Sequence, residues 1–258
     1  MIKSLYSGIS GLNANTQQMG VIGDNIANIG TTGYKSTQIA FDSLVNQSSS
    51  GYTGTEIGSG VILGSVNYNW SQGTLQQTSN PYDMAITGSG FFAVKDSSGK
   101  MYYTRDGGFK FDASGNLVTA AGNIVQGFDM TGAQKPINID PKTYTSVTVD
   151  NSGTYYGVDS SGAKKALFQI AIYKPTDQSK MAKMTGNLYT DTSTATGTFN
   201  LPGANGVGAV TASSLEMSNV DIAKEFVNMI TAQRAFAADS KVIQTSDQIL
   251  QELMTIKQ

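Results

Sequence analysis

The chain has 258 residues and a net charge of −2, so it is long enough for one large or two modest domains. It contains neither cysteine nor histidine, which excludes disulfides and removes the commonest general base and the commonest metal ligand. The near-neutral charge gives no indication of nucleic acid or an anionic membrane as a partner. No apolar run approaches the roughly 18 residues that span a bilayer, so we expect no membrane insertion. Met1 to Tyr6 are not followed by the apolar core of a cleavable secretory signal.

The first thirty residues predict an amphipathic helix whose apolar stripe follows a heptad. The residues of this predicted seam are Leu5, Ile9, Leu12, Met19 and Ile26. Each of the glycines in the segment weakens the helix by about 1 kcal/mol relative to alanine, and charged residues are almost absent. A helix of this kind is marginal by itself, so we expect it to fold when it is buried between neighbours. The alternative is an ordinary buried helix of a monomer.

Asn25 to Lys35 should end this helix, because Asn and Gly supply the conformations of a helix C-terminus. The chain then becomes extended, and Val61 to Leu63 are typical of a strand. Ser48 to Gly51 are expected to form a flexible loop. We interpret residues 35–75 as an arm that joins a helical part to a β part.

Residues 76–212 predict an all-β region built from short hairpins. Five turns share the pattern Asp-x-(Ser/Thr)-Gly, which suits a type I turn that closes a hairpin. These turns begin at Asp96, Asp112, Asp129, Asp150 and Asp159. The carboxylates would alternatively be calcium ligands, but the acidic alternation and the distal Glu of a calcium loop are missing. We therefore expect no metal site and no cofactor.

The β region leaves a carbohydrate-binding or adhesive module open as another class of function. Tyr155, Tyr156 and Tyr173 would serve such a module if they were exposed, although aromatic residues favour strands in any case. An enzyme without His or Cys would need a pair of carboxylates, as in glycosidases. The acids of this region mostly occupy turn positions, so we nominate no catalytic residue.

Ser218 to Lys257 predict a second, long helix with a heptad of its own. Its apolar row consists of Ile222, Met229, Phe236, Ile243 and Leu250. The companion row, four residues later in each repeat, is polar through its middle. Ser218 is expected to cap the first turn, with Asp221 three residues beyond it. Because both ends of the chain share one periodicity, we expect them to pair as a coiled coil used for assembly. The alternative is two amphipathic helices packed on a core.

Three stretches of the chain carry a family signature. The first comprises Asn25, Ala27, Asn28, Thr31, Gly33, Tyr34 and Lys35. The second runs through Gln72-Gly73-Thr74-Leu75, Gly88 to Phe92 and Tyr103 to Gly107, and the third through Leu215 to Asp221 and Gln233 to Phe236. In this order the stretches resemble the axial proteins of the bacterial flagellar rod and hook. The resemblance covers most of the chain and is weakest over about 133–212.

The resemblance implies a structural subunit, not an enzyme, that polymerises helically into a tube. Its implied partners are further copies of itself, other flagellar axial proteins at the ends of the tube and the flagellar export apparatus. Its implied location is the hook or basal body of the flagellum, outside the cell after type III export without a cleaved signal.

Two members of the family are close in type to this chain. The length resembles that of the distal rod protein, but the short run from Phe41 to Gly58 lacks a segment that the rod protein usually carries. Val125 to Phe128, Leu215 to Asp221 and the ending Leu250 to Lys257 look more like the hook protein. We therefore predict the flexible, torque-transmitting hook, with the distal rod as the alternative.

The expected fold class is mainly β, with long N- and C-terminal helices that pair as a coiled coil and an all-β central domain. The expected domains are a discontinuous helical coiled-coil domain (1–34 with 214–258), an extended linking arm (35–75) and a β-rich outer domain (76–213).

Overall fold

The structure is a computed structural model that describes residues 2–46, 57–140, 143–144, 146–159, 162–194 and 197–256. The loop predicted at Ser48 to Gly51 lies outside the described residues. The chain is mainly β with one helix near each end, which confirms that part of the predicted fold class. It divides into two compact units. We call Met1–Ile29, Lys35–Trp70 and Val220–Gln258 the helical unit, and Gly30–Tyr34 with Ser71–Asn219 the β unit.

The helical unit contains α1 (Ile2–Ala27), β1 (Thr37–Asn46), β2 (Ile57–Tyr68) and α2 (Ile222–Ile256). At the end of α1, Asn28 turns its amide back to the carbonyl oxygen of Asp24, at 2.9 Å. At the start of α2, the carboxylate of Asp221 accepts from the backbone N–H groups of Ala223, at 2.9 Å, and Lys224, at 3.2 Å. The cap is therefore Asp221 and not Ser218, because a cap side chain must reach the N–H groups two and three residues later.

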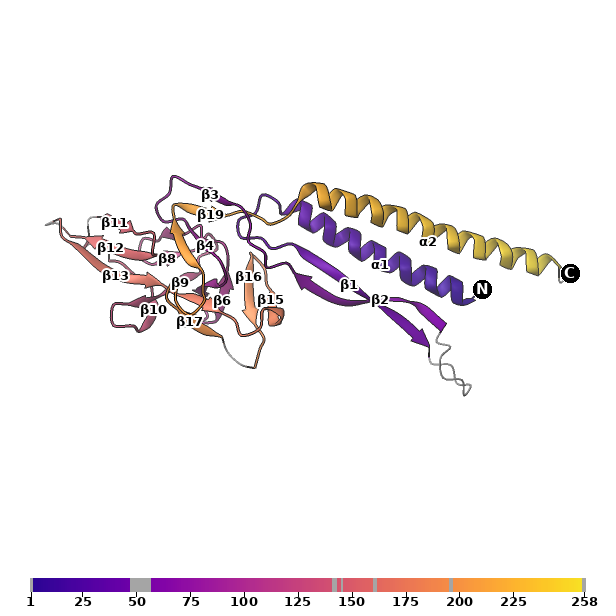
Figure 1. Cartoon of the computed structure of the whole chain (residues 1–258), viewed down its shortest axis with the longest axis horizontal. Coiled ribbons are helices and arrows are strands. Elements are labelled where there is room, and N and C mark those ends of the chain that lie inside the picture. The colour runs from indigo at the N-terminus through magenta and orange to yellow at the C-terminus, as the bar shows by residue number, and fades with distance from the viewer. Residues whose placement is uncertain are drawn as a thin grey trace. The chain divides into compact units, whose positions relative to one another are not determined.

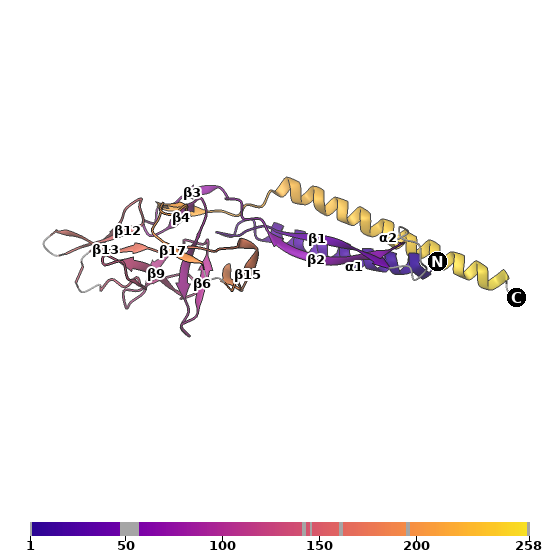
Figure 2. The ribbon, with the colours of Figure 1, turned by 60° about the horizontal axis from the view of Figure 1, so that its bottom comes forward.

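The extended region after α1 folds back on itself as a hairpin. β1 and β2 pair antiparallel from Thr37 opposite Tyr68 to Asn46 opposite Ile57, with two register shifts. The hairpin packs on α1, where the backbone N–H of Val61 donates to Ser10 Oγ at 3.2 Å (Figure 2). An extended chain with a strand at Val61 to Leu63 was predicted, but the pairing of that strand with Thr37–Asn46 was not.

The β unit is built from short strands around one large sheet. The strands are β3 (Leu75–Gln77), β4 (Met84–Thr87), β5 (Phe91–Lys95), β6 (Met101–Thr104), β7 (Lys110–Phe111), β8 (Leu117–Val118), β9 (Ile124–Asp129), β10 (Gln134–Pro136), β11 (Ser146–Val149), β12 (Thr154–Val158), β13 (Lys164–Ile170), β14 (Ile172–Lys174), β15 (Met181–Lys183), β16 (Leu188–Asp191), β17 (Thr198–Asn200), β18 (Ala209–Ala212) and β19 (Ser214–Glu216). A short 3-10 helix covers Gln178–Lys180.

The main path through the sheet has the order β11-β12-β13-β9-β5-β6-β16-β15, and the named pairings are antiparallel. β4 pairs with β18 and β3 pairs with β19, so the last strands of the unit return to its first strands. The core is apolar and almost completely buried. It includes Met84, Ile86, Phe92, Val94, Leu117, Val125, Ile170 and Ile172.

The five predicted Asp-x-(Ser/Thr)-Gly turns are confirmed. In each turn the glycine N–H donates to the carbonyl oxygen of the aspartate, at 2.9 to 3.1 Å. Each of these glycines has a φ between 73° and 90°, which favours glycine over other residues. The aspartate carboxylates accept from their own turns, as Asp96 does from the backbone N–H groups of Ser98 and Lys100.

The aromatic residues considered for a carbohydrate site do not form an exposed cluster. Tyr155 and Tyr173 are completely buried, because strand pairing turns their rings into the interior. Tyr173 stacks on Tyr103 with ring centroids 3.8 Å apart, and its hydroxyl donates to Asp191. Tyr156 is half-buried. A ligand therefore has no access to the rings of Tyr155 and Tyr173.

Candidate assembly surface

The two helices of the helical unit lie side by side and antiparallel (Figure 1). Three contacts between side chains fix their alignment. Asn25 Nδ2 donates to Glu225 Oε1 at 3.2 Å, Asn15 Nδ2 donates to Asp239 Oδ2 at 2.9 Å, and the hydroxyls of Ser4 and Ser246 are 3.4 Å apart. From one contact to the next, the residue number falls along α1 (25, 15, 4) while it rises along α2 (225, 239, 246). The pairing inside one chain is therefore antiparallel and carries polar groups at each of these levels.

Small residues of α1 allow this close approach. A Cβ added at Gly8 would lie 3.1 Å from Ile243 Cγ1, and one added at Gly11 would lie only 2.5 Å from Asp239 Oδ2. The glycines that weaken α1 as an isolated helix are thus the positions at which α2 packs against it.

The face of α2 that contacts α1 has its own period of seven. Glu225, Ala232 and Ser246 are the most buried residues of α2, and Asp239, half-buried, occupies the same row. This row lies three residues after the predicted apolar row. The contact inside one chain is therefore centred on small and polar side chains.

The predicted seam residues border this contact. Leu5, Leu12, Met19, Ile26, Met229, Ile243 and Leu250 are half-buried, whereas Ile9, Ile222 and Phe236 are exposed. The structure brings Ile243 against Gly8 but leaves Ile222 with 47% of its surface exposed. The role of these residues in contacts between copies stays a prediction.

Further apolar side chains of the helices face solvent. They are Tyr6 on α1 and Phe226, Val227, Ile230, Val242, Ile249, Leu253 and Met254 on α2. Exposed apolar surface of this extent is typical of proteins that bind other proteins. We call these residues, together with Ile9, Ile222 and Phe236, the exposed apolar face. Sequence periodicity identified only part of it.

The first signature stretch is divided between the two units. In the helical unit, the Asn25 amide pairs with the backbone of Thr37, donating to its carbonyl and accepting from its N–H, both at 2.9 Å. Asn28 closes the end of α1, and Lys35 is buried. Ala27 is exposed in the described structure. Asn25 thus holds β1 against the end of α1.

In the β unit, the loop Gly30–Tyr34 is packed against buried backbone. Gly33 has a φ of 66°, and a Cβ there would lie 2.5 Å from the backbone nitrogen of Asp106. The carbonyl of Thr31 accepts a hydrogen bond from Tyr34. The ring of Tyr34 is buried and lies beneath the ammonium group of Lys183, 4.0 Å from it. The loop needs glycine at position 33 for both reasons, its φ and its surroundings.

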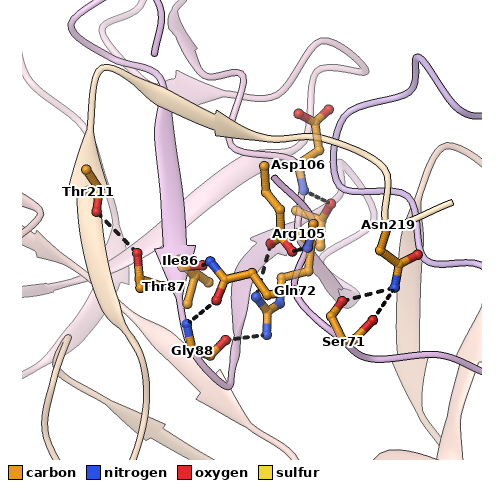
Figure 3. A network of polar contacts seen from close by, with 12 residues as sticks. Ser71, Gln72, Ile86, Thr87, Gly88, Arg105, Asp106, Thr211 and Asn219 are labelled. Carbon is orange, nitrogen blue, oxygen red and sulfur yellow. Dashed lines mark hydrogen bonds and ion pairs between the residues drawn. The ribbon is translucent and has the colours of Figure 1, made fainter. Parts of the chain in front are cut away.

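A buried ion pair joins the second and third signature stretches (Figure 3). Arg105 Nη1 lies 3.1 Å from Glu216 Oε2, and Arg105 Nη2 donates to the carbonyl of Gly88 at 2.8 Å. Glu216 Oε1 accepts from the backbone N–H of Gly73 at 2.9 Å, and its carbonyl accepts from Gly33 at 2.7 Å. Burial lowers the pKa of the Arg105 guanidinium, while the carboxylate of Glu216 opposes that shift. The pair therefore ties residues from all three signature stretches together within the β unit.

Side chains around the pair continue the network (Figure 3). Gln72 Oε1 accepts from the N–H of Gly88 at 2.9 Å, and Gln72 Nε2 donates to the carbonyl of Ile86 at 3.2 Å. Asn219 Nδ2 donates to both the carbonyl and the hydroxyl oxygen of Ser71. Sequence reasoning singled out these stretches as a signature but did not pair Arg105 with Glu216.

Among the described residues, no group of three or more acidic, His or Cys side chains is placed to hold a metal ion. None of the helices in the described part of the chain is long and apolar enough to cross a membrane.

Two helices with an exposed apolar face, together with a β unit tied by a buried network, define a structural protein that assembles with partners. Family models agree with this class. One described as the flagellar hook protein FlgE/F/G D1 domain matches residues 85–156, the flagellar basal body rod FlgEFG protein C-terminal model matches 211–256, and the flagella basal body rod protein model matches 5–35. The chain belongs to the family of flagellar hook and basal-body rod axial proteins. It is a structural component of the bacterial flagellum and not an enzyme.

Individual relatives are similar over their whole length. The flagellar basal-body rod protein FlgG of Bacillus subtilis is 38% identical, with 100% of each chain covered. FlgG of Buchnera aphidicola subsp. Acyrthosiphon pisum is 36% identical over 98% of this chain and 99% of its own. The flagellar hook protein FlgE of Brucella suis is 26% identical over 98% of this chain and 100% of its own.

Proposed function

We propose that this protein is a subunit of the distal rod in the flagellar basal body. The observation that carries the proposal is the full-length match to basal-body rod proteins at 38% and 36% identity. The hook protein of Brucella suis aligns at 26% over 399 positions, many more than the 258 residues of this chain. That hook protein therefore contains long segments that have no counterpart here.

Two of the three stretches that favoured the hook in the sequence have structural roles in the β unit, while the third begins at Leu250 in α2 of the helical unit. Val125 to Phe128 lie in β9 of the main sheet, and Leu215 and Glu216 lie in β19 beside the buried ion pair. Residues that hold the common fold together do not discriminate between members that share it. These stretches are therefore weaker support for the hook than the full-length identity is for the rod.

Assembly is proposed to proceed through the terminal helices. The exposed apolar face of α1 and α2 would be covered by the helices of neighbouring copies, which form a coiled coil together with the predicted seam residues. Contacts of this heterologous kind do not close on themselves and generate helical tubes. Other axial proteins would continue the tube at its two ends, and the export apparatus would deliver the subunits. The division into a helical domain, a linking arm and an outer β domain is part of the same proposal.

The test is electron microscopy of basal bodies from a clean deletion of the gene in the source bacterium. The proposal expects a truncated rod that carries no hook. A complete rod without a hook would instead assign the protein to the hook. Intact flagella would contradict both assignments.

A further inference from the structure

The acidic residues at the contact between α1 and α2 are paired with amides and not with cations. Within the described residues, neither Asp239 nor Glu225 has a Lys or Arg within ion-pair distance. We propose that Asp239, seated against Gly11 and bonded to Asn15, determines which helix pairs with α1 and in which register. Glu225 with Asn25 provides a second point of the same kind.

The site of Asp239 is narrow and directional. Its carboxylate occupies the space above Gly11, where an added Cβ would lie 2.5 Å from Oδ2 and 2.9 Å from Cγ. The same oxygen accepts from Asn15 Nδ2 at 2.9 Å. Gly8, one turn earlier on α1, lies close to the backbone of α2. A Cβ added at Gly8 would be 3.6 Å from the carbonyl oxygen of Asp239. A helix that lacked this pair of glycines would not admit α2 at this depth.

The site of Glu225 repeats the chemistry at the other end of the contact. Glu225 is 7% exposed, and its two carboxylate oxygens accept from Asn25 at 3.2 Å and from Asn228 at 3.5 Å. Asn25 is itself held by the backbone of Thr37. Its amide is therefore oriented by the backbone of β1, so Glu225 meets a donor that is held from its other side.

A shifted register would lose both pairs together. Sliding α2 by seven residues places Ala232 or Ser246 opposite Asn15 and removes the donor of Asp239. A carboxylate that is buried without its donor destabilises the helix pair, because its desolvation is no longer compensated by a hydrogen bond. One polar group at a helix contact fixes register in coiled coils by the same physics, at some cost in stability. Pairing of α2 with a second α2 fails for the same reason, since the glycines and Asn15 belong to α1.

The contact between α1 and α2 and the exposed apolar face use different residues. What this separation means for assembly rests on the proposed function. The polar row specifies the α1–α2 pair, so the exposed apolar face stays available for other copies of the chain. Had the contact used Ile222 and Phe236, fewer apolar residues would remain for neighbours.

The chain has no cysteine, so introduced cysteine pairs report the register directly. Ser4→Cys with Ser246→Cys tests the observed register, because the two hydroxyls are 3.4 Å apart. Ser4→Cys with Leu253→Cys tests a register shifted by seven residues. In purified full-length chain under mild oxidation, we expect the first pair to form its intrachain disulfide about tenfold faster or more, since a hydrogen bond to a charged group favours one register by that factor.

Asp239→Leu separates specificity from stability. The proposal expects this variant to keep its helix content by circular dichroism while the tenfold preference between the two cysteine pairs falls severalfold. Restoring a donor and an acceptor with Asn15→Asp and Asp239→Asn together should restore the preference. A preference unchanged by Asp239→Leu would overturn the proposal.

A second variant protects the test if Asp239→Leu unfolds the helices. Gly11→Ala should lower the preference because its Cβ displaces Asp239, whereas Gly20→Ala, with nothing within 4 Å, should not. Equal effects of the two changes would also overturn the proposal. The cross-linking result does not depend on whether the chain builds rod, hook or neither, so its failure is distinct from failure of the proposed function.

Discussion

The guanidinium of Arg105 lies 3.1 Å from the carboxylate of Glu216, and both side chains are almost completely buried. The two residues are 111 positions apart in the sequence. Through Glu216 the pair also holds the backbone of Gly73 and Gly33. It is thus the contact at which three separated parts of the chain meet within the β unit.

Replacing Arg105 with methionine should destabilise the β unit strongly. The change leaves the Glu216 carboxylate buried without its cation, which typically costs about 3–5 kcal/mol in the free energy of unfolding. Urea denaturation followed by circular dichroism measures the loss. Lys135→Met removes the exposed ion pair with Asp129 and serves as the control, for which we expect no measurable change. Similar denaturation midpoints for the two variants would contradict the role assigned to Arg105.

Gly33→Ala should damage the folding of the loop Gly30–Tyr34. The new methyl group would lie 2.5 Å from the nitrogen of Asp106 and 2.6 Å from the carbonyl carbon of Arg105, at a φ of 66°. Strain at a left-handed position alone costs on the order of 1–3 kcal/mol. The matched control is Gly30→Ala, which meets nothing within 4 Å. Thermal unfolding of the two variants should differ clearly, and a difference within error would show that this loop yields without cost.

Which of these features were predictable depends on how local they are. The five hairpin turns were correct because Asp and Gly three residues apart, at the first and fourth positions of the turn, determine that geometry by themselves. The ion pair between Arg105 and Glu216 was not predicted, since nothing in either neighbourhood names a partner 111 residues away.

The heptad period of both helices was visible, but the face used inside one chain was not. That face is made by Gly8, Gly11 and Asn15 against Asp239, and an analysis of apolar periodicity does not detect small or polar residues. The glycines of α1 did predict burial between neighbours, because of their cost to an isolated helix. They did not predict that the packing partner would be the row of α2 that contains Asp239.

Stability above pH 10 should depend on Tyr173. Burial, and next the hydrogen bond to Asp191, raise the pKa of its hydroxyl well above the ordinary value of 10.0. The folded state therefore keeps a proton that the unfolded state releases, so this contribution is complete below pH 10 and is lost as the pH rises toward the folded pKa. Tyr173→Phe should lower stability at neutral pH, because it removes the bond to Asp191, but should flatten the decline between pH 9 and 11. Urea midpoints across that range measure the slope, and an unchanged slope would mean that Tyr173 titrates alike in both states.

Ile243→Asp should block assembly while leaving the β unit folded. Ile243 is half-buried beside Gly8, where an added carboxylate would be desolvated next to apolar surface and close to the carboxylate of Asp239. The expected result is loss of rods and hooks in electron micrographs of cells that carry the variant. The purified chain should retain the β-sheet signal and the urea midpoint of the wild type, since α2 contributes nothing to the core of the β unit. Gln244→Asp places the same charge on the neighbouring exposed position and should assemble normally. Normal flagella from Ile243→Asp would show that Ile243 does not belong to the seam. Loss of assembly in both variants would show that the added charge, and not its position, prevents assembly.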